Sequence, residues 1–449
     1  MGTIYVDTGG AATNSGSTDQ NTANLSGTGD ATVSGSVVQL TAGTDLSGVV
    51  TTAGATQSSI YLAQATNTNQ QIFWITAKDD ALDQVTVSVA PTGITGSNWA
   101  IGGRFVWTAA SIEAAVRAGD TIILNNSPAS AAADWITTRV AGDSTSGYIT
   151  LKGKSGVRPV VTVTNTLQCI EAGAFVLWKF ENVELAQQGA SGNVVTTNSA
   201  AAGLLFYNVK VSDGGSYGLS LSGGGNRTVA CEVTGVTLGI AQGNSTSSAH
   251  VGNYIHDVSV DGILISVTTP VVVLLNNIVD TAAGRGIYLS GGPTSVNISS
   301  IIGNTIYGCG DSGLEVADAD AMVFLLNNIF AENGNAAGEY NIEWVAGNAE
   351  LVSFHAWNVF YHSGGGGGAN LSGLTVNAQV ASSEFTTDPG FTNAAGADFS
   401  ISSTSPAKAA GFPGVFLGAG CTGYLDIGAV QRQEPSGGIG ALVGGSLIR

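Results

Sequence analysis

An asparagine followed by an apolar or β-branched residue recurs along this chain, and its spacing limits the possible folds more than any other feature. The members are Asn182, Asn208, Asn253, Asn277, Asn304, Asn328 and Asn358. Successive members lie 24 to 30 residues apart, except for one gap of 45 residues that contains a weaker copy at Glu232. A second series, in which each member precedes Leu or Ile, keeps nearly the same step: Gly218, Gly239, Gly262, Gly286, Gly313 and Asn341. A fixed period of this length is typical of solenoids and other repeat architectures.

Each repeat contains short β-type segments of three to five residues and no helical pattern, which excludes helical repeats. The repeats are also shorter than the roughly 40 residues of a propeller blade. An all-β parallel β-helix over residues 121–365 is therefore the predicted fold. The 64 glycines among 449 residues suit its tight corners, and the 43% of hydrophobic residues, recurring in register, argue against disorder.

The flanks differ from the repeats in composition and pattern. Residues 1–103 alternate apolar and polar residues around a turn at Asp79-Asp80, which predicts a small N-terminal β-domain and a candidate attachment domain. Within residues 104–120, a helix from Ala109 to Ala118 with Gly119 as its C-terminal cap is predicted to cover the end of the solenoid. Residues 366–434 are expected to end the solenoid, and residues 435–449 to form a Gly-rich flexible tail.

The repeat motifs Asn277-Ile278 with Gly286-Ile287-Tyr288, and their counterparts one repeat later, resemble the right-handed parallel β-helix proteins of the pectate-lyase-like superfamily. The lead-in Ala114–Leu124 and an ending that runs from Asp388-Pro389-Gly390-Phe391 to Asp426-Ile427-Gly428-Ala429 extend this resemblance over residues 104–432. It implies that the repeated asparagines stack as a structural ladder inside the corners. The superfamily contains lyases, hydrolases, adhesins, phage tailspikes and structural rods, so the resemblance fixes fold rather than function.

Charge and cysteine usage exclude several classes of function. A formal net charge of −18 argues against nucleic acid and anionic membranes as partners. The four histidines and four cysteines show no metal-ligand spacing, so no metal or cofactor is expected, and Cys231 and Cys309 are interpreted as small core residues. The first residues contain no basic start and no long apolar stretch, which predicts the absence of a signal peptide and production in a cytoplasm.

One outward-facing column carries candidate chemistry. Alignment of the second series places Leu264, Tyr288, Glu315 and Glu343 on neighbouring coils, with the two carboxyl groups about 5 Å apart by strand spacing. This spacing suits a retaining glycoside hydrolase, with Tyr288 as a sugar-stacking ring. The alternative is a solvated acidic strip. Arg285 could serve as the cation or base of a polysaccharide lyase, or pair with nearby carboxylates.

Three functions follow from these patterns. The first is a non-catalytic virion protein of a bacteriophage, a spike, fibre or capsid-decorating rod that binds other virion proteins and contacts host glycans, as a homo-oligomer such as a trimer. The second is a polysaccharide-degrading tailspike that uses Glu315 and Glu343. The third is a secreted adhesin or carbohydrate-binding β-helix. The chain lacks GxSxG and the polygalacturonase-like motifs, which favours a protein without catalytic activity.

Overall fold

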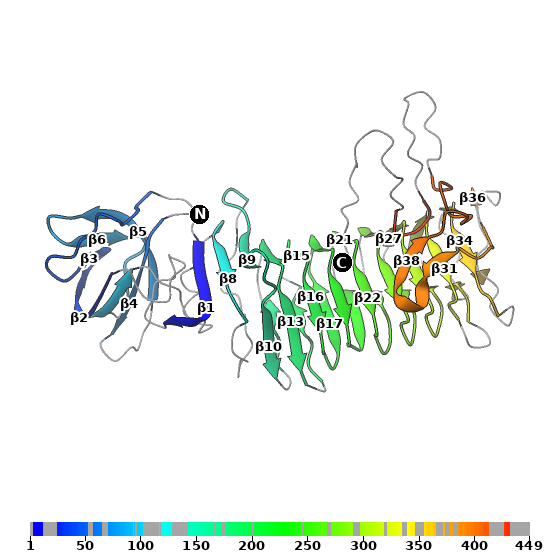
Figure 1. The fold of residues 1–449 in the computed structure, drawn as a ribbon, viewed down its shortest axis with the longest axis horizontal. Coiled ribbons are helices and arrows are strands. Elements are labelled where there is room, and N and C mark those ends of the chain that lie inside the picture. The colour runs from blue at the N-terminus through cyan, green and yellow to red at the C-terminus, as the bar shows by residue number, and fades with distance from the viewer. Residues whose placement is uncertain are drawn as a thin grey trace, which may run out of the picture. The chain divides into compact units, whose positions relative to one another are not determined.

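The computed structural model describes two compact units of the chain (Figure 1). The first unit holds residues 1–164, 168–186 and 203–205, and the second holds residues 165–167, 187–202 and 206–449. The described residues are 3–11, 25–52, 57–64, 71–92, 94, 97–101, 116, 118–127, 142, 144–164, 167–172, 177–189, 191–199, 202–243, 247–266, 271–290, 297–317, 321–334, 339–345, 354–364, 371–372, 378–379, 385–412 and 426–431. Within these ranges, no helix is long and apolar enough to cross a membrane.

A closed antiparallel barrel forms the first part of unit one. Its strands follow the order β2-β3-β6-β5-β4-β7 around the barrel. Their bounds are β2 (Leu25–Ser34), β3 (Val37–Gln39), β4 (Ser59–Gln64), β5 (Gln71–Asp79), β6 (Gln84–Val87) and β7 (Ser97–Ile101). The strand alternation directs Ile60, Ile75, Val85 and Trp99 into one buried core. Asp79 Oδ1 accepts the N–H groups of residues 81 and 82 and so fixes the turn predicted at this position.

The first strand of the chain does not belong to this barrel. β1 (Thr3–Ala11) pairs in parallel with β8 (Thr121–Leu124), the first strand of the solenoid. The barrel therefore comprises residues 25–101, whereas the sequence suggested one domain over residues 1–103. A strand added to β8 satisfies backbone groups that would otherwise be left at an open sheet edge.

The remaining strands of unit one start the solenoid. β8, β9 (Ile149–Gly153) and β12 (Trp178–Glu181) pair in parallel. The other strands here are β10 (Val160–Thr164), β11 (Ile170–Ala172) and β13 (Glu184–Gln188). The predicted helix Ala109–Ala118 lies outside the described residues apart from the buried Val116, which is in no helix, and residue 118, which lies in a turn with Gly119.

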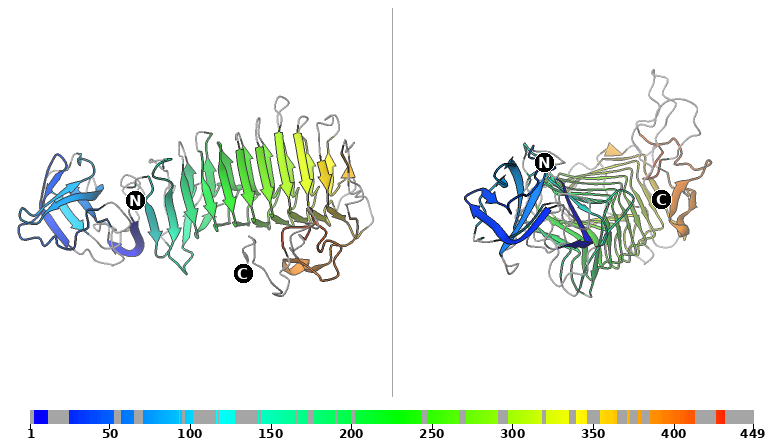
Figure 2. Two further views of the ribbon diagram at one scale, coloured as in Figure 1. Left: turned by 90° about the horizontal axis from the view of Figure 1, so that it is seen from above. Right: turned by 60° about the vertical axis from the view of Figure 1, so that its left-hand side comes forward.

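The second unit is a parallel β-helix, in which successive stretches of chain add one strand to each of three parallel sheets (Figure 2). Sheet 1 contains β15 (Leu205–Tyr207), β18 (Asn226–Val229), β21 (Ser247–Val251), β24 (Val271–Leu275), β27 (Asn297–Ile302), β30 (Ala321–Leu326), β33 (Phe354–Ala356) and β36 (Ala378–Gln379). Sheet 2 contains β16 (Lys210–Ser212), β19 (Glu232–Thr234), β22 (Tyr254–His256), β25 (Ile278–Asp280), β28 (Thr305–Tyr307), β31 (Ile329–Ala331) and β34 (Val359–Tyr361). Sheet 3 contains β14 (Val195–Thr197), β17 (Tyr217–Ser222), β20 (Leu238–Gly243), β23 (Ile263–Ser266), β26 (Ile287–Leu289), β29 (Leu314–Val316), β32 (Ile342–Trp344) and β35 (Leu371–Ser372). The predicted fold class is confirmed.

The asparagine ladder lies in the corner between sheets 1 and 2. Asn253, Asn277, Asn304, Asn328 and Asn358 are all buried, and each Nδ2 donates to Oδ1 of the next member over 2.8 to 3.0 Å. Each Oδ1 also accepts the backbone N–H of the preceding member. The amide side chain suits this position because it can donate and accept at once. For these five residues the predicted ladder is confirmed.

The ladder prediction is wrong for Asn182 and Asn208. Both have positive φ, 53° and 52°, and occupy the corner position one residue before the ladder. The buried Val183 and Val209 stand at the ladder position of these coils. Asparagine adopts the left-handed conformation more readily than most residues, so the same residue type suits both neighbouring positions. In the coil before Asn253, the ladder position belongs to Cys231, whose N–H donates to Asn253 Oδ1.

The glycine series lies where the chain enters sheet 3. The residues that follow it form one inward column of strand partners, from Leu219 through Ile240, Ile263, Ile287 and Leu314 to Ile342. A Cβ atom on Gly286 would meet the side chain of Ile306 and lie 2.6 Å from the Gly313 carbonyl oxygen. None of the glycines in this series has a left-handed backbone, so their conformation does not explain the choice of glycine. Glycine is required here because the neighbouring coil leaves no room for a side chain.

The C-terminal segment packs along the outer surface of sheet 2. It contains β37 (Phe391–Asn393), a 3₁₀ turn (Ala394–Gly396), β38 (Asp398–Ile401) and residues 405–412 and 426–431. Ile401, Ala407 and Ile427 bury Ile329 and Val359, which point outward from β31 and β34. The sequence predicted an end cap over residues 366–434. Within this range, β35 and β36 are the last described strands of sheets 3 and 1. Residues 391–412 and 426–431 instead cover the side of the solenoid, and we call them the C-terminal cover.

His250 is a fully buried histidine inside the solenoid, and we expect it to make stability depend on pH. Its Nδ1 lies 2.9 Å from Thr228 Oγ1, and burial lowers its pKa from 6.5 to about 4. The unfolded chain binds a proton below about pH 6.5, whereas the folded chain does not bind it until about pH 4. Stability is therefore complete above pH 6.5 and falls by about 3 kcal/mol toward pH 4.

The measurement is the unfolding temperature of the wild type and of His250→Leu between pH 7 and pH 4. Leucine is chosen because the strand partner of His250 in the next coil is Leu274. The variant is expected to lose less stability than the wild type over this range. Identical pH profiles for the two proteins would refute the assignment to His250.

Candidate functional site

The outward column expected on sheet 3 is present. Leu264 pairs with Tyr288, Tyr288 with Glu315, and Glu315 with Glu343, as the central residues of β23, β26, β29 and β32. All four side chains are partly exposed, because their strand neighbours point into the core. The register of the repeats thus brings the two glutamates to adjacent strands.

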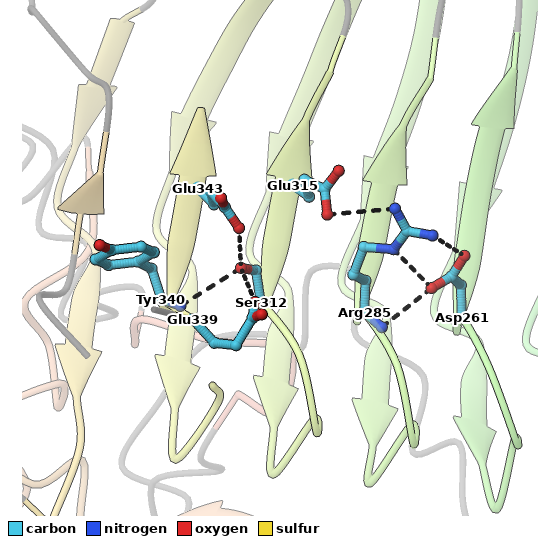
Figure 3. A network of polar contacts seen from close by, with 7 residues as sticks. All are labelled: Asp261, Arg285, Ser312, Glu315, Glu339, Tyr340 and Glu343. Atoms are coloured by element: carbon cyan, nitrogen blue, oxygen red, sulfur yellow. Dashed lines mark hydrogen bonds and ion pairs between the residues drawn. The ribbon is translucent and has the colours of Figure 1, made fainter. Parts of the chain in front are cut away.

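Arg285 bridges two carboxylates beside this column (Figure 3). Its Nε and Nη2 donate to the two oxygens of Asp261 over 2.9 and 3.0 Å, a bidentate pair. Its Nη1 donates to Glu315 Oε2 over 3.2 Å. Asp261 is only 3% exposed, and its Oδ1 also accepts the backbone N–H of Arg285. Asp261 therefore holds Arg285 by both its backbone N–H and its guanidinium group.

The guanidinium of Arg285 also covers one face of the Tyr288 ring. Its Cζ lies 3.5 Å from the ring centroid, a cation–π contact. Stacking of a sugar on Tyr288 is therefore restricted to the face that Arg285 leaves open.

Glu343 has a different environment from Glu315. Ser312 Oγ donates to Glu343 Oε2 over 2.9 Å, and lies 3.4 Å from Glu339 Oε2 (Figure 3). The backbone N–H of Tyr340 donates to the same hydroxyl. Ser312 is buried, so it holds Glu343 from beneath while the carboxylate stays partly exposed.

Burial and charge shift the ionisation of this network. The pKa of Glu315 is raised, because burial outweighs the opposing effect of Arg285 and the nearby charge of Glu343 adds to the rise. Burial acts to lower the pKa of Arg285, but its pairs with Asp261 and Glu315 outweigh burial and raise that pKa. Arg285 therefore stays protonated, and its positive charge offsets part of the acidic charge around it.

Two residues of this network, Asp261 and Ser312, could have been found from the sequence. Asp261, Arg285, Ser312 and Tyr340 each directly precede a member of the glycine series, so they form a second column beside the first. Arg285 and Ser312 of this second column reach the first column on the next coil, at Glu315 and Glu343, 30 and 31 residues further along the chain. Asp261 and Ser312 were not predicted as site residues, because only the column after the glycines was aligned. No cluster of His, Cys, Asp or Glu among the described residues is arranged to hold a metal ion.

A second polar cluster lies on the outer surface of sheet 2. His256 stacks on Tyr254 with ring centroids 4.3 Å apart, and its Nδ1 lies 2.7 Å from Asp257 Oδ2. Tyr254 donates its hydroxyl to Asp280 Oδ2 over 3.1 Å. Burial lowers the pKa of His256, but hydrogen bonds with Glu232 and Asp257 outweigh this effect and raise it. The cluster holds His256 between carboxylates that favour its charged form, which explains its polar composition without a ligand.

Sequence and structure comparisons agree on the fold. The pattern of the family described as right handed beta helix region matches residues 191–348. No curated protein matches the chain. The crystal structure of the pectate lyase Pel9A superposes with a TM-score of 0.56 at 17% identity, covering 74% of this chain and 92% of the lyase chain. At this identity the likeness shows a shared right-handed parallel β-helix and nothing about activity.

A phage protein gives a weaker match. The tailspike protein gp49 from Pseudomonas phage LKA1 aligns with 83% of this chain and 69% of its own at 12% identity, with a TM-score of 0.25. A superposition of that quality supports no conclusion about this chain.

Proposed function

We propose that this protein is a non-catalytic structural rod of a phage virion, as a spike, fibre or capsid decoration, and that its sheet 3 surface contacts host glycans. The observation that carries the proposal is the closed network beside the outward column. Arg285 is held by Asp261 and Glu315, and Ser312 holds Glu343. Acid–base catalysis needs a group that is free to exchange its proton with a substrate. Side chains bound to one another in this way instead form a rigid, polar surface.

The same surface suits sugar hydroxyls. Glu315 and Glu343 are partly exposed and offer carboxylate oxygens as acceptors, and Tyr288, covered on one face by Arg285, supplies an aromatic ring in the same column. Because the column follows the strand register, these groups repeat at about 4.8 Å along the sheet. A polymer of hydroxyl-rich units could contact several of them at once, which favours weak, multivalent binding.

The test of the structural role is the composition of purified particles. We expect the protein at a fixed copy number on virions that have been washed at high salt. We also expect that deleting the barrel, residues 25–101, removes it from the particle while the β-helix still folds. A protein found only in the medium or on the host surface would favour the adhesin hypothesis and contradict the proposal.

One observation favours a second candidate, a polysaccharide-cleaving enzyme. The raised pKa of Glu315 is the property required of a general acid, and Glu343 lies on the adjacent strand. In this hypothesis Glu315 would protonate the glycosidic oxygen and Glu343 would act as the nucleophile. The salt bridge from Arg285 to Glu315 opposes it, because a protonated carboxyl loses the charge that holds the arginine.

Incubation with host capsule or exopolysaccharide distinguishes the two candidates. We expect no new reducing ends and no unsaturated sugars from the wild type. If products do form, Glu315→Gln tests the site: a loss of at least about 100-fold would support the enzyme, since a general acid contributes about that much. Asp257→Asn, on the exposed side of sheet 2, is the matched carboxylate control.

A further inference from the structure

The outer surface of sheet 1 is apolar over three consecutive strands. On β24, β27 and β30 the residues that point outward alternate with buried core residues. They form three columns along the sheet. We call the following nine residues the apolar surface of sheet 1: Val271, Val273, Leu275, Ile298, Ser300, Ile302, Met322, Phe324 and Leu326. Val271 is 45% exposed, and the other eight are partly exposed.

This surface continues onto the neighbouring strands without a charged residue. Ala249 and Val251 of β21 pair with Val273 and Leu275, and Phe354 of β33 pairs with Phe324. The nearest outward charge on the described strands is Arg227 of β18, on the far side of β21. By strand spacing and rise, the surface measures about 20 Å by about 15 Å. A contiguous apolar patch of about 300 Å² is comparable to the largest patch on a typical soluble monomer, and such patches are often functional.

Sheet 2 also has outward apolar residues, and these are covered by another part of the chain. Its outward apolar residues Ile329 and Val359 are 1% and 0% exposed, because the C-terminal cover packs on them. The apolar surface of sheet 1 stays partly exposed in the described part of the chain.

We infer that the apolar surface of sheet 1 is the contact between two copies of this chain. Each copy carries a net charge of −18, so copies repel one another except where a surface without charge faces its equivalent. Two sheets pack face to face at about 10 Å with their outward side chains interdigitated. A two-fold axis between the sheets would place each column against the same columns of the partner, which makes the surface self-complementary.

The nature of the surface argues for a copy rather than another class of partner. A glycan would need polar groups, and Ser300 is the only polar member of the nine. A strongly charged protein or nucleic acid would lose its hydration there without compensation. At about 20 Å by about 15 Å the surface is smaller than a standard specific interface, so we expect weak association that depends on protein concentration.

The test is the mass of the intact protein by sedimentation equilibrium over a range of concentrations. We expect a multiple of the 45.0 kDa chain mass for the wild type. Phe324→Lys should weaken association by at least about 100-fold, because the new charge would be buried without a partner. Lysine lowers the net negative charge, so weaker association could not result from greater overall repulsion between copies. Leu264→Lys, outward on sheet 3, is the matched control and should associate like the wild type.

Val273→Lys, two strands away in the same column, serves as the second variant if Phe324→Lys fails to fold, as judged by its unfolding temperature. A wild type that is monomeric at all concentrations would overturn the inference. So would an oligomer that persists unchanged in a folded Phe324→Lys or Val273→Lys protein. Loss of association in the Leu264→Lys control would also count against it, because the contact would then lie elsewhere.

Discussion

Replacing Asn304 by alanine is expected to lower the free energy of unfolding by about 4 kcal/mol. The Asn304 carboxamide Oδ1 accepts both the backbone N–H and the Nδ2 of Asn277, over 2.8 and 2.9 Å. Its Nδ2 donates to the Leu274 carbonyl and to Asn328 Oδ1. Alanine would leave the two donors of Asn277 buried without an acceptor, and each such group costs about 1–3 kcal/mol.

The measurement is chemical denaturation of the wild type and the variant, followed by circular dichroism. Asn208→Ala is the matched control, because it removes the same side chain from the left-handed corner position of another coil. Its cost should be smaller, about 1–2 kcal/mol, because alanine is placed at positive φ and the contacts of a side chain that is only partly buried are lost. Equal destabilisation by the two substitutions would show that the ladder adds nothing beyond corner geometry.

Replacing Gly286 by alanine is the second large effect, with an expected loss of about 3 kcal/mol. The new methyl group would meet Ile306 and would lie 2.6 Å from the Gly313 carbonyl oxygen. That oxygen accepts the N–H of Ile287 over 2.9 Å, so it cannot move without weakening the contact between coils. Adjacent coils share the glycine series, and the disturbance would therefore reach β26 and β29 together.

Gly243→Ala is the control for this substitution. Gly243 also lies in sheet 3, but a methyl group there would come no closer than 3.5 Å to any atom of the described residues outside its neighbours in the chain. The change should be less than about 1 kcal/mol in either direction. If Gly286→Ala proves equally mild, the series would reflect loop composition rather than close packing.

Sequence spacing was sufficient to predict the fold because each repeat shows its own strands and corners. It located five ladder asparagines correctly, and it also predicted the strand register that aligns Glu315 with Glu343. It failed at Asn182 and Asn208 because spacing defines a corner without distinguishing its two adjacent positions. Asparagine suits the first corner position because it tolerates a left-handed backbone, and it suits the following ladder position because its amide can donate and accept. Residue type alone therefore could not distinguish the two positions.

The site was less predictable because it depends on side-chain conformation. The sequence placed Arg285 near carboxylates, but its position over Tyr288 and its bidentate pair with Asp261 arise from packing between coils. The C-terminal cover shows a second limit. Ile427 and Val359 belong to one cluster although 68 residues separate them, and no local pattern connects such distant segments.

The C-terminal cover also has a consequence for the order of events during synthesis. Ala429 donates its N–H to Thr305, 124 residues earlier, and Phe412 is bound to Asn327 from 85 residues away. Until these last segments leave the ribosome, Ile329 and Val359 must remain uncovered on a sheet whose coils are already present. The cover is therefore synthesised after the coils that it protects, and the time taken to translate residues 330–427 sets how long Ile329 and Val359 are exposed to aggregation.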